Sequence, residues 1–71
     1  EAEIDYAINT LPKKCKMVFE MSRKEELKYS EIASKMDISV KTVEAQMSKA
    51  LKLLRMHLAE FLSLLFFLWK A

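Results

Sequence analysis

A chain of 71 residues, of which 52% are hydrophobic and 31% charged, forms at most one small domain, which excludes a disordered tail and disfavours an enzyme with a deep cleft. It has no glycine and one proline, so it lacks the turn residues that short-stranded sheets need, and we expect an all-α fold. The net charge of +2 does not by itself indicate a nucleic-acid partner, so the distribution of charge matters more than its sum.

The basic residues lie in two blocks. Residues 11–28 hold six basic and three acidic residues, which gives +3, and residues 41–56 hold four basic residues and one acidic residue, which also gives +3. The chain opens without methionine inside an expected helix, so we expect a fragment of a longer protein that contributes one domain over residues 1–71. Its single cysteine, Cys15, cannot form an internal disulfide, which predicts a reduced core thiol in a cytoplasmic protein.

Two helices are expected before residue 25. Apolar residues at Ile4, Ile8 and Leu11 predict a first helix over about 1–9 with an acidic outer face. Pro12 then starts a new element, because proline is tolerated in a first helical turn. The second helix, about 12–24, turns Cys15, Val18 and Phe19 inward and fades into the charged stretch "SRKEE", which predicts a solvated surface.

The segment after this surface predicts a helix-turn-helix over residues 29–55. A short third helix, about 29–36, turns Ile32 and Met36 inward. In the join "MDIS", Asp37 tolerates the backbone of a sharp turn, and Ser39 is a candidate N-cap for a helix that begins at Val40. Two helices joined by such a short turn and crossing steeply make this motif.

The fourth helix, expected over about 40–69, has two different faces. At about 100° per residue, one sector would face the core and holds Val43, Met47, Ala50, Leu51 and Leu54. The opposite side holds Lys41, Ala45, Ser48 and Lys52, and Thr42, Glu44 and Lys49 flank it. Such a basic, small and hydrogen-bonding face suits a DNA major groove, although an ordinary solvated helix face has the same pattern.

The stretch "LPKKCKMVFEMSRKEELKYSEIASKMDISVKTVEAQMSKALKLLR" resembles region 4 of extracytoplasmic-function (ECF) sigma factors, most closely the Bacteroidetes type. The resemblance covers Leu11 to about Leu58 and rests on "LP", "C", "VF", "EIA", "IS", "TVE" and "AL" in order. It implies a four-helix domain whose last helix reads the promoter −35 element, while another surface docks on the β flap of RNA polymerase. "EIA" with "TV" also occurs in LuxR-type response-regulator output domains, which are the alternative DNA binders.

The resemblance also places contact residues. The family's base-facing and backbone-facing positions fall on Lys41, Thr42, Glu44, Ala45, Gln46, Ser48 and Lys49. Several relatives have arginine in place of Glu44 and Gln46, so a different set of bases is expected. We expect these two residues to discriminate bases and Lys41, Lys49 and Lys52 to contact phosphates. Lys13, Lys14 and Lys16 are candidates for the edge of the footprint.

The end of the chain, "FLSLLFFLWKA", extends the fourth helix with an apolar tail that has only Glu60 and Ser63 as polar residues from Leu58 to Trp69. It is shorter than the roughly 20 apolar residues of a membrane span. It can be buried on the domain's own first helix, on a second copy of the chain, or on a partner such as polymerase or an anti-sigma factor. We expect a homodimer or a partner surface formed by Phe61, Leu62, Leu65, Phe66, Leu68 and Trp69.

Nothing in the sequence predicts catalysis, a metal or a cofactor. His57 is the only histidine, and no glycine-rich phosphate loop or nucleophile motif is present. We therefore expect a non-enzyme. Three hypotheses remain, namely promoter recognition by a sigma factor, a response-regulator output domain, and a helical interaction module without a DNA role.

Overall fold

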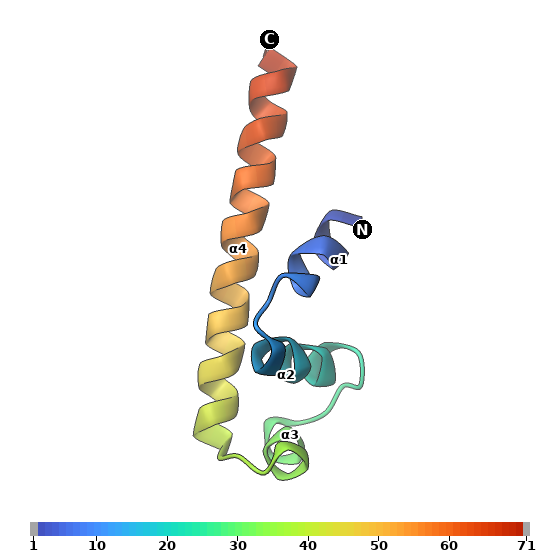
Figure 1. Cartoon of the computed structure of the whole chain (residues 1–71), viewed down its shortest axis with the longest axis vertical. Helices are drawn as coiled ribbons and strands as arrows, with labels where there is room; N and C mark the ends of the chain where they lie inside the picture. Colours follow the sequence, from blue (N-terminus) through green and yellow to red (C-terminus); the bar gives the residue numbers. More distant parts are fainter. Residues whose placement is uncertain (1, 71) are drawn as a thin grey trace.

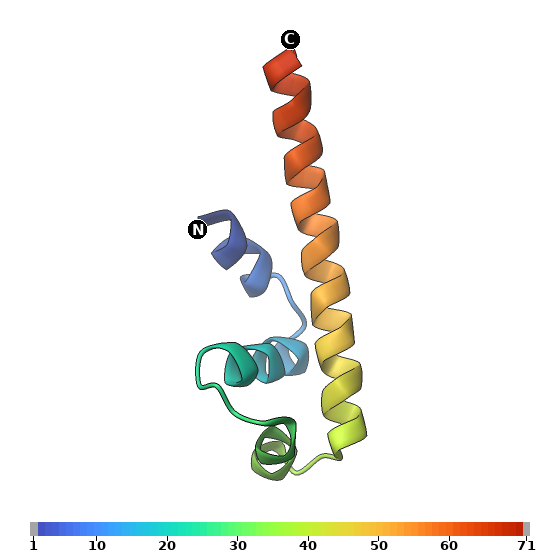
Figure 2. The same cartoon turned by 180° about the vertical axis from the view of Figure 1, so that it is seen from behind.

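The computed structural model describes residues 2–70, and these form four α-helices in the order α1 (Ala2–Asn9), α2 (Lys13–Arg23), α3 (Tyr29–Met36) and α4 (Val40–Lys70). Helices α1 to α3 stack one below another along the N-terminal half of α4, whose other half projects beyond them (Figure 1). The view from behind shows the same stack against one side of α4 (Figure 2). The predicted all-α class, with four helices and a long last helix, is confirmed.

The core lies where the apolar stripes of the four helices meet. Val18, Ile32 and Val43, from α2, α3 and α4, are completely buried and form its centre. Around them lie the other buried members, Ile8, Leu11, Cys15, Phe19, Ala33, Met47 and Ala50. Because α3 has only eight residues, it is too short to be stable alone, and this shared core holds it in place.

The prediction that Leu51 on α4 faces the core is wrong. Leu51 is 44% exposed, although periodicity placed it with Val43 and Ala50, which are fully buried. It lies about 100° around the helix from Ala50, on a side that α1, α2 and α3 leave open. Leu53 and Leu54 are partly buried against the core.

The corner between α3 and α4 is sharp and is held by local hydrogen bonds. Asp37 adopts the left-handed conformation with φ of 55°, and the backbone N–H of Ile38 donates to the carbonyl of Ala33 across 3.0 Å. Ser39 then caps α4, because its Oγ accepts the backbone N–H of Thr42 at 3.0 Å. The turn role predicted for Asp37 and the cap predicted for Ser39 are both confirmed.

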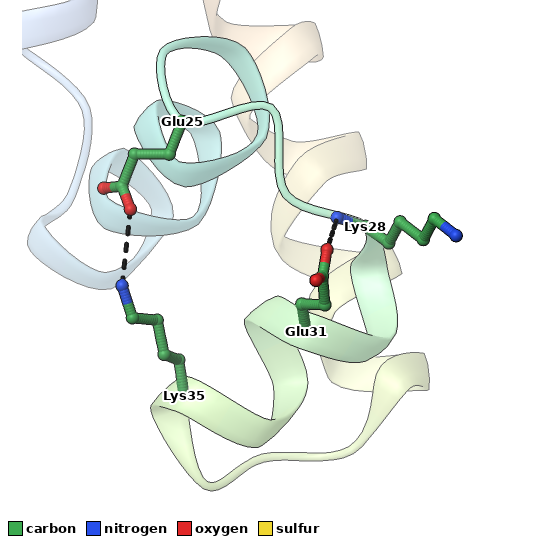
Figure 3. Close-up of polar contacts among 4 residues, drawn as sticks. All are labelled: Glu25, Lys28, Glu31 and Lys35. Carbon is green, nitrogen blue, oxygen red and sulfur yellow. Dashed lines mark hydrogen bonds and ion pairs between the residues drawn. The ribbon is translucent and has the colours of Figure 1, made fainter.

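The region between α2 and α3 is a solvated surface of charged side chains. The ammonium of Lys35 lies 3.4 Å from a carboxylate oxygen of Glu25, and the backbone N–H of Lys28 donates to Glu31 Oε1 across 2.7 Å (Figure 3). The second contact satisfies one of the free N–H groups at the start of α3. Because both side chains of the Lys35–Glu25 pair are exposed, this pair adds little to stability.

Helix α1 packs beside the middle of α4. Beyond this contact, α4 is not covered by the other helices. Thr10 Oγ1 lies 3.1 Å from His57 Nε2, and the ring of Tyr6 contacts the ring of His57 edge-on with centroids 6.4 Å apart. Phe61 is half-buried, whereas the apolar residues from Leu62 to Trp69 are exposed. Within residues 2–70, no helix is long and apolar enough to cross a bilayer.

Candidate nucleic-acid interface

The first turns of α4 present a continuous outward surface, which we call the reading face. All four of its members, Lys41, Ala45, Ser48 and Lys52, are exposed. On the other side of the same turns, Val43, Met47 and Ala50 are buried against α1, α2 and α3. The packing that forms the core therefore turns the reading face to solvent, as the helical periodicity predicted.

The residues that flank the reading face differ in what they can offer to a ligand. Glu44 and Lys49 are exposed. Thr42 is also exposed, but its Oγ1 lies 2.9 Å from Ser39 Oγ, so this hydroxyl is held at the helix start. Gln46 is half-buried. At about 100° per residue it lies well away from the reading face, so only its flexible amide can reach toward that side.

The charge on this part of α4 is mostly positive. Between residues 40 and 59 there are four basic residues and one acidic residue, Glu44. The basic residues are Lys41, Lys49, Lys52 and Arg55. All five side chains are exposed, so the positive charge is available to an anionic ligand. Short side chains at Ala45 and Ser48 keep the centre of the face low, which lets the helix backbone approach a groove floor.

Helix α2 supports the interface from beneath. The Cys15 thiol donates to the backbone carbonyl of Gln46 across 3.4 Å, which ties α2 to the second turn of α4. Burial raises the pKa of this thiol, and the nearby positive charge of Lys49 partly offsets the rise. The inward stripe of α2 identified Cys15 as a core residue, but no sequence signal indicated that its partner would be a main-chain carbonyl of α4.

The N-terminal end of α2 lies beside α4 in both views (Figures 1 and 2). Lys13 and Lys14 are exposed there, and Lys16 is half-buried. Within residues 2–70, no cavity is present and no three histidine, cysteine or acidic side chains gather at a potential metal site. What the arrangement offers a ligand is therefore a convex, basic helix face that suits the recognition of a grooved polyanion.

Comparisons with known proteins bear on the identity of this surface. The family model described as "Sigma-70, region 4" matches residues 1–54, a segment that includes all four helix starts and the whole reading face. Searches of curated proteins and of solved structures return no match. The chain therefore belongs to the sigma-70 region 4 family, in a form typical of ECF sigma factors: it is a non-enzymatic domain that works with RNA polymerase and binds the promoter −35 element in transcription initiation.

Proposed function

We propose that the chain reads the −35 element by placing the reading face in the major groove. The observation that carries this assignment is the exposure of Lys41, Ala45, Ser48 and Lys52 on the side of α4 that faces away from the core. The Ser39 cap fixes where the helix begins, so these side chains are held in one register along the groove. Ala45 and Ser48 would lie over the base edges.

Two flanking residues would supply base discrimination. The exposed carboxylate of Glu44 can accept a hydrogen bond from cytosine N4, and the amide of Gln46 can pair with adenine N6 and N7. The negative charge of Glu44 is repelled by phosphates. We therefore expect its carboxylate, at the edge of the reading face, to bind a base. Gln46 would reach its base by extending its amide from a half-buried position toward the reading face.

The lysines would supply the affinity that does not depend on sequence. Lys41, Lys49 and Lys52 are exposed along α4, at or beside the reading face, so each can neutralise a phosphate on a strand that borders the groove. Thr42 would contribute a contact to the DNA backbone from the first turn of α4. Lys13 and Lys14 would extend the footprint, because the start of α2 lies beside α4 and its free N–H groups attract anions.

We further propose that the chain is the Bacteroidetes type of ECF region 4 and acts in the cytoplasm, with the β flap as its docking site on RNA polymerase. The ordered resemblance from "LPKKC" to "LKLLR" supports this finer assignment. An anti-sigma factor is a further candidate partner. The exposed apolar end of α4 offers a surface for such partners that the reading face does not use.

Titration of labelled duplex DNA at two salt concentrations tests the proposal. We expect a preferred short site, selected from random duplexes, and an affinity that falls steeply with salt. Binding that shows no salt dependence, or substitution of Ala45 by arginine that leaves the selected site unchanged, would contradict the reading-face assignment. A pulldown with the isolated β flap tests the docking proposal separately, because it requires no DNA.

A further inference from the structure

A stripe of exposed side chains runs along α4 from the second half of the reading region to the end of the helix. We call it the apolar stripe, and its members are Leu51, Arg55, Leu58, Leu62, Leu65 and Trp69. Its apolar residues range in exposure from 38% for Leu58 to 84% for Trp69. All but one of the six lie beyond the residues that the family model matches, so the family's DNA-binding role does not account for the stripe.

The spacing of the apolar stripe is that of a coiled-coil seam. Its members follow one another at alternating intervals of four and three residues, the repeat that keeps one face of a helix against a partner helix. At about 100° per residue, the stripe lies about 90° from the reading face on one side and about 70° from the buried residues Val43, Met47 and Ala50 on the other. Helices α1 to α3 therefore leave it uncovered even at Leu51 and Leu58, where they pack against α4.

We propose that a second copy of this chain covers the apolar stripe, with the two α4 helices side by side and antiparallel. The intervals 4, 3, 4, 3, 4 read the same in both directions, so reversal about Glu60 brings stripe positions opposite stripe positions. Leu58 then lies opposite the partner's Leu62, and Leu51 lies opposite the partner's Trp69. Such self-complementarity is what a two-fold symmetric interface requires.

Charge and area favour a second copy over an oppositely charged partner. Arg55 is the only charged residue of the stripe, and reversal places it opposite Leu65, where its aliphatic stem can lie on the leucine while its head stays in water. At about 200 Å² for each fully exposed large side chain, the five apolar members offer about 500 Å² per chain, or about 1,000 Å² for two chains. This is the lower limit for a specific interface, so we expect a weak dimer with a dissociation constant of about 1–100 µM.

The symmetry of this dimer leaves DNA binding possible. The two-fold axis is perpendicular to the plane of the two antiparallel helices, so a face at right angles to the seam points the same way in both copies. Both reading faces would therefore lie on one side of the dimer and both sets of α1 to α3 on the other. The dimer seam and the reading face are different faces of α4, so dimerisation and the contacts of the reading face can each be lost without the other.

The single tryptophan gives a direct readout. Trp69 is the only tryptophan of the chain, it is 84% exposed, and in the dimer it would be covered by the partner's Leu51. We expect its emission to shift to the blue as the full chain is concentrated from about 1 to 200 µM, in parallel with a monomer-to-dimer transition in sedimentation. A chain that stays monomeric throughout this range would overturn the proposal, and so would a monomer that instead floats with phosphatidylcholine vesicles.

A matched pair of variants tests the stripe itself. L62E with L65E places two charges in the seam and should raise the dimer dissociation constant more than about 10-fold, with unchanged helicity and unchanged affinity for a single DNA site. F67E adds a charge to the far side of the same tail, where Phe67 is 69% exposed, and should leave the dimer intact. If F67E weakens association as much as the seam variant does, the association is non-specific and the proposal fails.

Cross-linking tests the direction of the helices. In a C15A background, a chain carrying L58C is mixed with one carrying L62C, and the mixture is oxidised. Antiparallel helices predict faster cross-linking in the mixture than in either variant alone, because Leu58 of one copy faces the partner's Leu62. Faster cross-linking of each variant to itself would show parallel helices and overturn the arrangement.

Discussion

Ser39 Oγ accepts the backbone N–H of Thr42 across 3.0 Å, and the Oγ1 of Thr42 lies 2.9 Å from the same oxygen. This pair fixes the first turn of α4, because it satisfies an N–H group that has no partner within the helix. Lys41 lies in this turn and begins the reading face. The position of the first residue of the reading face therefore depends on the hydroxyl groups of Ser39 and Thr42.

Replacing Ser39 by alanine should destabilise the fold by about 1 kcal/mol, the usual cost of losing a serine N-cap. DNA affinity should fall as well, because the first turn of α4 would fray. Urea denaturation and a duplex titration measure the two effects. S34A removes the same hydroxyl at an exposed position of α3 and is the control, which should lower neither the stability nor the DNA affinity. An unchanged stability in S39A would mean that the cap has no energetic role.

Asp37 has a φ of 55°, a conformation that costs residues with a Cβ atom more than it costs glycine. We expect D37G to match or exceed the stability of the natural chain, by up to about 1 kcal/mol. D37V should lose about 1–2 kcal/mol, because a β-branched side chain clashes in this conformation. Thermal unfolding compares the three, and equal stability of the valine and glycine variants would argue against the left-handed turn.

Removing Lys52 should weaken binding to all duplexes alike and reduce the slope of log affinity against log salt by about one unit. K24A makes the same change of charge at the far end of α2, where Lys24 pairs with Glu20 at 3.5 Å, and should leave the slope unchanged. Titrations at several salt concentrations separate the two. Equal slopes for both variants would remove Lys52 from the phosphate contacts.

Substitution of Gln46 or Glu44 by alanine should relax the preference at one base pair each, by on the order of 1–3 kcal/mol, while other positions keep their preference. Selection of bound sequences from random duplexes measures this directly. Gln46 is the sharper test, because its half-buried position admits a purely structural role. A Q46A variant with lower stability but the same selected site would assign it that role.

The Cys15 thiol should make the fold less stable at high pH. Burial raises its pKa in the folded state above the ordinary value of 9.0, so above this pH the unfolded chain releases a proton that the folded chain retains. The free energy of unfolding should therefore fall as pH rises past 9, and C15A should fall less steeply. Slow reaction of the thiol with a disulfide reagent at neutral pH, rapid only in denaturant, is the matching expectation.

Local signals predicted much of the fold. The apolar spacing predicts the burial of Val18, Ile32 and Val43, and the structure confirms it. The turn at Asp37 and the cap at Ser39 are also confirmed. All of these signals depend on residues within one or two helical turns of one another. The ordered motifs likewise predicted the sigma-factor hypothesis that the family match confirms.

Contacts between distant segments were not predictable. Thr10 and His57 are 47 residues apart in sequence, and nothing in either segment indicates the other. Periodicity predicts that Leu51 faces the core, but it defines only a sector of a helix and not how much of that sector the neighbouring helices cover, and Leu51 is exposed. For the same reason the sequence left the burial of the apolar tail open, and the contact residues on the reading face stay predictions that the binding experiments must test.

Helix α4 continues without a break for 31 residues, so its two ends are about 46 Å apart. It thus acts as a rigid spacer between the promoter and anything that binds the far end. That separation exceeds several Debye lengths at physiological ionic strength. A partner seated at the tip can therefore carry charge of either sign without changing how strongly the lysines at the other end hold the phosphates.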